Sequence, residues 1–310
     1  MTDIKEITTT VIGEDDDAPV ASIIDAKNSE EEEEEVEDTT LLNEIKKAGF
    51  SIGFSEDRNK RCRRTMEDAH AYFYNFNDVE GQGYFAIFDG HAGKQAAEWC
   101  GKQLHENLIE ILKESPDMPI QESLNKAFLK TDSQLNEKRG IPSGCTAIVV
   151  LVRKEKIKDE NNNEVEKRVL YSANVGDARA VLSRNGHALR LSCDHKGSNR
   201  EEVQRITDAG GFVLNARVNG VLAVTRSLGD YSMKEWVIGN PYTSRVVLDD
   251  NDKFLILACD GVWDVCSDDE AVELIENITD PQEASEVLLK HALENFSTDN
   301  LSVLIVRFHE

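Results

Sequence analysis

Two stretches decide the fold: Tyr84-Phe85-Ala86-Ile87-Phe88-Asp89-Gly90-His91 and Phe254-Leu255-Ile256-Leu257-Ala258-Cys259-Asp260-Gly261. In each, an apolar run of strand length ends at an aspartate, and a glycine follows where the chain turns. Asp-Gly is a common turn dipeptide, so either pair alone is explained by a turn. Two such strand ends that converge would instead bring hard oxygen ligands together for a divalent metal.

Composition describes a globular protein with an acidic N-terminal segment. The 310 residues are 40% hydrophobic and 30% charged, which is ordinary for a soluble globular chain. The net charge is −24, and residues 1–40 hold 15 acidic and 2 basic residues, hence −13. Self-repulsion and scarce apolar surface predict that residues 1–40 form a disordered acidic tail. By length, the rest of the chain could hold one large domain or two. This negative field disfavours nucleic acid as a partner.

The expected compartment is intracellular. No apolar stretch approaches the roughly 18–20 residues that cross a bilayer, and the acidic N-terminus lacks the layout of a secretory signal. The six cysteines show no C-x-x-C pairing and several lie in apolar runs, which indicates buried free thiols in a reducing compartment. We expect a cytoplasmic and nuclear location and no membrane partner.

Hydrophobic periodicity predicts strands and helices in groups. β-branched and aromatic runs predict strands at Tyr84–Phe88, Thr146–Val152, Val169–Asn174, Ala178–Ser183, Ala188–Leu191, Lys253–Cys259 and Leu301–Phe308. Apolar residues at helical spacing predict helices over residues 93–114 and 120–138. Helix starts are indicated by Ser198 with Glu201, Ser267 with Glu270, and Asp280-Pro281. The polar segment 153–168 reads as a solvated loop. Grouped helices and grouped strands favour a mostly antiparallel sheet system flanked by helices.

Acidic residues follow several of these strands, where loops are positioned by a rigid scaffold. Beyond the two Asp-Gly turns, they occur in the segments around Glu67, Asp177, Asp264 and Asp299. Carboxylates and water are the ligands that Mg²⁺ and Mn²⁺ prefer, and no Cys/His grouping indicates zinc. Two metals that share an aspartate can activate water for attack on phosphorus. A nearby arginine suits phosphate oxygens, and a histidine can protonate a departing alkoxide.

Seven motifs follow one another along the chain: Met66-Glu67-Asp68-Ala69-His70, Phe88-Asp89-Gly90-His91-Ala92-Gly93, Ser143-Gly144-Cys145-Thr146-Ala147, Asn174-Val175-Gly176-Asp177-Ala178-Arg179, Leu222-Ala223-Val224-Thr225-Arg226-Ser227-Leu228-Gly229-Asp230, Ala258-Cys259-Asp260-Gly261-Val262-Trp263-Asp264 and Ser297-Thr298-Asp299-Asn300. In this order they resemble the motif series of the metal-dependent protein phosphatase family, type 2C, and the resemblance implies that residues 41–310 form a single catalytic domain. The resemblance runs from about Phe50 to Phe308 and is greatest to small fungal members. The family fold is α+β, a central antiparallel β-sandwich flanked on both sides by paired α-helices, in four layers, αββα.

The resemblance implies a role for each site residue. Asp89 would bridge two metals, and Gly90 would offer its carbonyl. Asp260 and Asp299 would complete one metal's shell, while Glu67 and Asp68 would bind metal or its waters. Asp177 and Asp264 would contribute to a third, weaker metal site. Arg63 would hold the substrate phosphate, with Arg64 as the competing candidate, and His91 would be the general acid.

The function implied is a serine/threonine protein phosphatase with at least two Mg²⁺ or Mn²⁺ ions per subunit. A metal-bound hydroxide would attack phosphoserine or phosphothreonine directly, since no cysteine sits in a C-x₅-R loop. The partners implied are phosphorylated proteins and protein kinases of a stress or MAP kinase cascade, for a monomeric enzyme that opposes kinase signalling. Two alternatives stay open: a pseudophosphatase scaffold and a phosphohydrolase of small molecules or nucleotides.

Several residues near the motifs have simpler explanations. His70 is expected to be a packed or surface histidine, Arg179 and Arg226 to pair with carboxylates, Trp263 to lie in the core and Arg64 to face solvent. His195 either shapes a flap-like segment over residues 198–219 or caps a turn. The family usually has proline after Asp194-His195-Lys196, where this chain has Gly197, and that departure concerns the rigidity of the flap-like segment.

Overall fold

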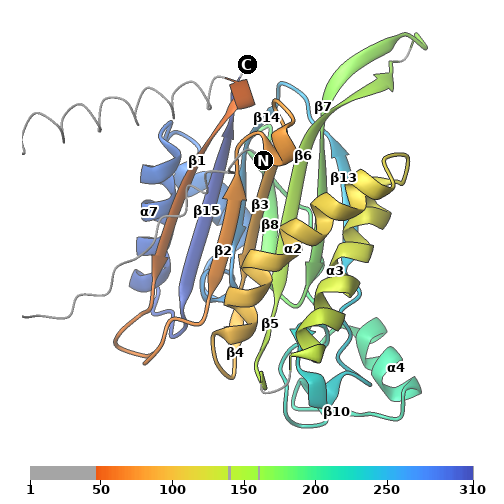
Figure 1. Cartoon of the computed structure of the whole chain (residues 1–310). Helices are drawn as coiled ribbons and strands as arrows, with labels where there is room; N and C mark the ends of the chain where they lie inside the picture. Colours follow the sequence, from red (N-terminus) through yellow and green to blue (C-terminus); the bar gives the residue numbers. More distant parts are fainter. Residues whose placement is uncertain (1–46, 139–140, 160, 310) are drawn as a thin grey trace, which may run out of the picture. The chain divides into compact units, whose positions relative to one another are not determined.

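The computed structural model describes residues 47–138, 141–159 and 161–309. The expected acidic tail over residues 1–40 therefore lies outside the described residues. The described part is mixed α+β with antiparallel sheets (Figure 1). None of its helices combines the length and apolar character that a bilayer-spanning segment requires.

One five-stranded antiparallel sheet has the strand order β13-β7-β6-β3-β2. Its strands are β2 (Ala69–Phe73), β3 (Gly83–Phe88), β6 (Ala147–Lys158), β7 (Glu164–Val175) and β13 (Tyr242–Val247). All of β3 is buried, as its unbroken apolar run predicts. The first of the two deciding stretches is β3, which lies between β6 and the edge strand β2 and ends just before Asp89.

The polar segment 153–168 is mostly strand, which corrects the expectation of a loop. β6 and β7 pair in register from Ala147↔Val175 to Lys158↔Glu164. Oppositely charged side chains face each other at Lys156↔Glu166 and Lys158↔Glu164, and such pairs stabilise an exposed hairpin without a hydrophobic run. Periodicity missed these residues because neither face of the extension is buried.

The other five-stranded antiparallel sheet has the order β1-β15-β14-β8-β9. Its strands are β1 (Phe50–Asp57), β8 (Arg179–Arg184), β9 (His187–Arg190), β14 (Asp252–Ala258) and β15 (Leu301–Phe308). The predicted Asn185-Gly186 hairpin joins β8 to β9, and both residues have positive φ, as a tight two-residue turn requires. The second deciding stretch is β14, between β15 and β8, and it ends just before Asp260.

The helices follow their expected starts with one exception. Ser267 and Glu270 form a capping box at α6 (Asp268–Ile275), and Asp280 caps α7 (Pro281–Glu294). The cap of α4 (Arg200–Asp208) is Asn199 and not Ser198, because the Asn199 side chain accepts from the backbone of residues 201 and 202. The other helices are α2 (Gln95–Glu114), α3 (Ile120–Glu137) and α5 (Asp260–Trp263), with short 3-10 turns at Phe76–Asp78 and Tyr231–Met233.

Short strands complete the described fold. β4 (Gly90–His91), β5 (Gly144–Cys145) and β12 (Leu228–Gly229) form a three-stranded ladder with β5 in the middle. β10 (Val213–Leu214) pairs with β11 (Arg217–Val218). The ladder matters for the site, because it places the chain just after Asp89 and the chain just before Asp230 on the two sides of β5.

Three large hydrophobic clusters hold these elements together, and a small fourth one contains Ile206, Val218 and Val237. The first joins α2 and α3 to the sheet that holds β3, including Leu104, Phe128 and Val149. The second draws residues from both sheets, including Phe85, Ile148 and Leu257. The third joins the sheet that holds β14 to α5, α6 and α7. Figure 1 shows α2 and α3 along one sheet and α7 beside β1 and β15.

Candidate active site

Three carboxylates from separate strand ends meet at one point. Asp89 follows β3, Asp177 lies in the turn between β7 and β8, and Asp260 follows β14. Oxygen atoms of these three side chains all lie within 4.8 Å of one another. The fold therefore converts the two Asp-Gly turns of the sequence, together with a third aspartate, into one cluster.

Electrostatics make this cluster costly without a cation. Burial raises the pKa of Asp89 well above its usual value, and the neighbouring carboxylates of Asp260, Asp68 and Asp177 raise it further. The pKa of Asp260 is raised well above its usual value by burial and then by Asp177 and Asp299. Like charges crowded in a low-dielectric site cannot all ionise unless a positive charge is added.

Asp177 has an unused ligand atom. Its Oδ1 is buried and has no hydrogen-bond partner among the described residues. Its Oδ2 lies 3.2 Å from Lys196 Nζ, which also lies 3.0 Å from Asp264 Oδ1. The lysine ammonium thus joins the two residues expected at a third metal site, while the free oxygen of Asp177 suits a hard cation.

Asp68 belongs to the same acidic region. Its Oδ2 accepts a hydrogen bond of 2.7 Å from Ser302 Oγ on β15. Burial raises the pKa of Asp68 to about 6, and the carboxylate of Asp299 contributes to the increase. Asp68 is therefore electrostatically linked to both Asp89 and Asp299, as its expected role requires.

Glu67 and Gly90 lie against each other. A Cβ at Gly90 would lie 2.3 Å from the carbonyl oxygen of Glu67, so no larger residue fits without a backbone shift. The Glu67 carboxylate accepts hydrogen bonds from Thr65 Oγ1 at 2.9 Å and from Gly93 N at 3.0 Å. These contacts hold the predicted ligand Glu67 beside the turn that follows Asp89.

Arg63 reaches the site through Asp299. Its Nη2 pairs with Asp299 Oδ2, and its Nε donates to the Thr298 carbonyl at 3.3 Å. The Arg63 side chain is 46% exposed, so the guanidinium stands at the solvent boundary of the cluster. Arg64 is exposed, as expected, and Arg63 is the arginine that the fold brings to the carboxylates.

His91 is held by a residue to which the sequence analysis gave no role. Its Nε2 lies 2.7 Å from Asp230 Oδ2, and Ser227 Oγ donates to the same oxygen. Asp230 has φ of 51°, a left-handed conformation that directs its side chain into the site. A Cβ at Gly144 would lie 2.2 Å from Asp230 Oδ2 and 2.6 Å from His91 Nε2. The sequence feature that could have indicated a role for Asp230 is its position at the end of the motif Leu222–Asp230.

The family model described as "Protein phosphatase 2C" matches residues 52–301. The chain belongs to the protein phosphatase 2C family. It is similar to protein phosphatase 2C homolog 1 of Saccharomyces cerevisiae, with 48% identity over 83% of this chain and 93% of that protein. It is also similar to protein phosphatase 2C homolog 1 of Schizosaccharomyces pombe, with 43% identity over 84% of this chain and 74% of that protein.

A solved structure supports the same assignment. A phosphatase from Toxoplasma gondii matches with a TM-score of 0.71 and 25% identity, over 84% of this chain and 93% of that chain. The fungal resemblance seen in the motifs is confirmed by the two yeast relatives. This protein phosphatase 2C is a metal-dependent protein serine/threonine phosphatase.

The remaining motif residues of this protein phosphatase 2C are structural. His70 stacks on Phe54, and burial lowers its pKa to about 4. His195 is buried beside the Gly176 carbonyl, 3.2 Å from Nδ1. Trp263 is buried and donates to the Ala258 carbonyl at 2.8 Å. These contacts confirm the packed alternatives for His70 and Trp263.

Two arginines pair with carboxylates, as expected. Arg179 bonds to Asp194 at 2.7 Å and to Asp268 at 2.8 Å. Arg226 forms an ion pair of 2.6 Å with Glu202, which lies in the flap-like segment.

All six cysteines are free thiols, and four of them are buried.

Gly197 has a steric explanation in this structure. A Cβ there would lie 2.4 Å from the backbone oxygen of Ala216. The departure from the usual family proline therefore permits close packing of the flap-like segment against itself.

Proposed function

We propose that this protein phosphatase 2C hydrolyses phosphoserine and phosphothreonine in proteins at a dinuclear Mg²⁺ or Mn²⁺ centre. The observation that carries the proposal is the convergence of Asp89, Asp177 and Asp260 with a buried carboxylate oxygen left unpartnered among the described residues. Hard oxygen donors from several strand ends are the ligand set that these cations take.

The residues fit two or more cations. Asp89 would bridge two ions and the Gly90 carbonyl would serve one of them. Asp260 and Asp299 would bind one ion, and Glu67 and Asp68 would bind ions or their waters. Asp177 and Asp264 would serve a third. When bound, the ions supply Lewis acidity, which activates a water for direct attack on phosphorus.

Arg63 would bind the substrate phosphate. Its guanidinium stands at the open side of the cluster and pairs with Asp299, a proposed ligand. Once the charge of Asp299 is otherwise neutralised, Arg63 is free to turn its planar fork to two phosphate oxygens. Arg63 would thus neutralise the charge of Asp299 when no metal is bound, and bind the substrate phosphate when metal is bound.

His91 would deliver the proton that the departing serine or threonine oxygen needs. The hydrogen bond between Nε2 and Asp230 fixes the ring, so Nδ1 is the nitrogen left to donate. Gly144 and Ser227 support Asp230 from both sides. Asp230 is therefore proposed as the residue that orients the general acid.

The test compares wild type with Asp89→Asn on a phosphothreonine peptide, with Mn²⁺ and with EDTA. We expect metal-dependent turnover in wild type and its abolition in Asp89→Asn, with an unchanged circular dichroism spectrum. Asp117→Asn, at an exposed loop carboxylate, is the matched control and should keep wild-type turnover. Absence of metal-dependent turnover in wild type would favour a pseudophosphatase. Faster turnover of small phosphomonoesters than of phosphopeptide would favour a small-molecule hydrolase.

We further propose that the three hydrophobic clusters stack as the four layers αββα, with residues 41–310 as one catalytic domain after an acidic tail. The matched span of residues 52–301 supports that domain. By family resemblance, the enzyme would be a cytoplasmic and nuclear monomer that acts on phosphoproteins of a stress or MAP kinase cascade.

A further inference from the structure

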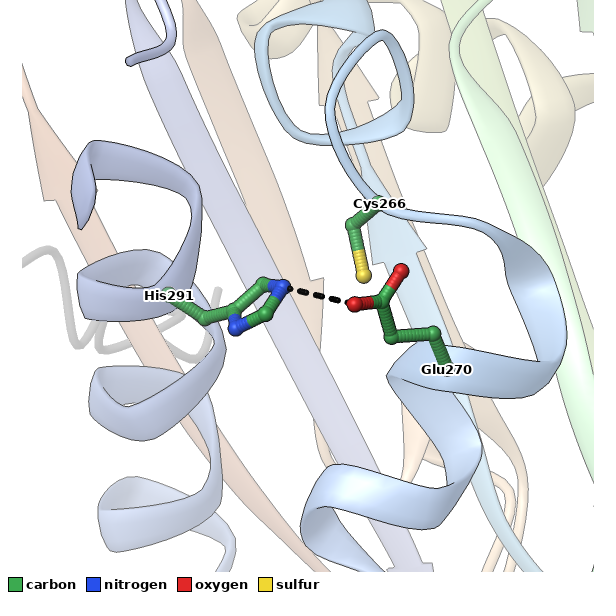
Figure 2. A group of neighbouring side chains, drawn as sticks. All are labelled: Cys266, Glu270 and His291. Atoms are coloured by element: carbon green, nitrogen blue, oxygen red, sulfur yellow. Dashed lines mark ion pairs between the residues drawn. The ribbon is translucent and has the colours of Figure 1, made fainter. Parts of the chain in front are cut away.

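Three donor groups of different chemistry gather between α6 and α7. Figure 2 shows Cys266, Glu270 and His291 pointing toward one another. The thiol sulfur, a carboxylate oxygen and an imidazole nitrogen all lie within 4.8 Å of one another. The expectation that no Cys/His grouping exists is thereby corrected, because the fold unites residues that lie 25 positions apart in the sequence.

The start of α6 fixes two of these donors. Cys266 is buried and immediately precedes Ser267, the N-cap of the helix. Glu270 completes the capping box, and its Oε2 accepts from Ser267 N at 3.3 Å. Its other oxygen, Oε1, is directed at His291 and lies 3.3 Å from Nε2. The capping box therefore orients a carboxylate oxygen beside the thiol.

Asn295, which follows the end of α7, orients the third donor, His291. Asn295 Nδ2 donates to the His291 carbonyl at 3.0 Å, which sets the orientation of the amide. The same nitrogen lies 3.1 Å from His291 Nε2, and it donates a hydrogen bond there when the imidazole is neutral with its proton on Nδ1. Nε2 then carries a lone pair and faces Glu270 Oε1, which is also a lone-pair atom. In that tautomer the two acceptor atoms, 3.3 Å apart, face a point at which one cation can bind both; with a protonated imidazole the same contact is an ion pair.

We propose that Cys266, Glu270 and His291 bind one Zn²⁺ ion, with water as the fourth ligand, and that the ion cross-links α6 to α7. Mixed sulfur, nitrogen and oxygen donors suit Zn²⁺, whereas the all-oxygen cluster around Asp89 suits Mg²⁺ or Mn²⁺. Burial, Glu270 and Asp268 raise the pKa of the Cys266 thiol to about 12. The thiol is therefore protonated without metal, and Zn²⁺ displaces that proton to solvent.

The experiment uses Co²⁺ as a spectroscopic probe for Zn²⁺ in the full chain. Excess Mg²⁺ occupies the carboxylate cluster and competes poorly for thiolate and imidazole. We expect a cobalt–thiolate charge-transfer band that saturates at one Co²⁺ per chain and disappears when Zn²⁺ is added. Zn²⁺ should also raise the thermal midpoint of wild type in the same buffer. Absence of the band from wild type overturns the proposal.

Variants assign the band to these residues. Cys266→Ala should abolish it, and His291→Gln should weaken Zn²⁺ binding at least about tenfold, since even outer partners of metal ligands cost that much. Glu270→Gln keeps the capping box and tests the carboxylate alone. The controls are Cys259→Ala, the buried thiol beside Asp68, and His187→Gln, an exposed histidine. A band that survives in Cys266→Ala and His291→Gln, or that disappears in Cys259→Ala, overturns the assignment.

Discussion

Replacing Asp68 by asparagine is expected to stabilise the metal-free enzyme. The Asp68 carboxyl has a pKa of about 6 in the fold against an ordinary value of 3.8. Because of that difference of about 2 pKa units, the ionised Asp68 lowers the free energy of unfolding by about 3 kcal/mol above pH 6. Asparagine keeps an oxygen for the Ser302 hydroxyl and removes the charge that raises the pKa of Asp89. We expect a thermal midpoint about 6–12 °C above wild type at pH 8.

The direction of the pH dependence follows from the raised pKa of Asp68. A raised carboxyl pKa means that the folded state binds the proton more tightly than the unfolded state. Asp68 therefore does not lower the free energy of unfolding of wild type below pH 3.8, and it lowers that free energy increasingly as pH rises to about 6. The stabilisation by Asp68→Asn should vanish near pH 4 and reach its full size above pH 7.

The assay is thermal unfolding in EDTA across this pH range, repeated with Mg²⁺. Asp117→Asn, at an exposed position, should match wild type throughout. Saturating Mg²⁺ should reverse the order of wild type and Asp68→Asn, because the wild-type carboxylate then contributes to cation binding. Equal midpoints of wild type and Asp68→Asn at pH 8 in EDTA would refute the argument.

Three other outcomes are expected. His91→Ala should slow phosphothreonine hydrolysis about 100-fold or more while sparing an ester with a good leaving group, with a smaller split for Asp230→Asn; equal losses on both substrates would argue against proton donation by His91. Burial opposes ionisation of Glu202, but hydrogen bonds from Arg226 and Arg205 lower its pKa to about 2. Glu202→Gln should therefore lower the free energy of unfolding by about 3 kcal/mol at pH 7, measured by urea unfolding. The difference between the two proteins should shrink as pH falls from 4.5 toward 2. Lys196→Gln should tighten binding of the weakest divalent cation several-fold in a Mg²⁺ titration, because the ammonium between Asp177 and Asp264 is removed; unchanged affinity would separate Lys196 from that site.

Strand ends could be predicted from the sequence because they combine a buried run with a turn. β3, β14 and β15 followed from unbroken apolar stretches, and the carboxylates after two of these strands converge as expected. β1 and β13 were not predicted, because partly exposed edge strands carry a weaker hydrophobic pattern. The outer half of the β6–β7 hairpin was missed for the same reason.

Contacts between distant residues that do not share a strand-end pattern could not be predicted. Asp230 reaches His91 across 139 positions, and nothing in local periodicity connects the two residues. Cys266, Glu270 and His291 meet only because α6 and α7 pack on the same sheet. Arg63 could be preferred over Arg64 only through the family motif, whereas the fold shows its contact with Asp299.

Lys196 and Arg63 affect the newly made enzyme before it binds metal. Each places a permanent positive charge on an outer carboxylate of the acidic cluster, at Asp177 and Asp299. These two positive charges therefore offset part of the carboxylate repulsion that opposes folding of the metal-free chain, whereas Asp89 and Asp260 keep strongly raised pKa values. The supply of free divalent cation in the cell would then act on both the activity of the enzyme and the stability of its fold.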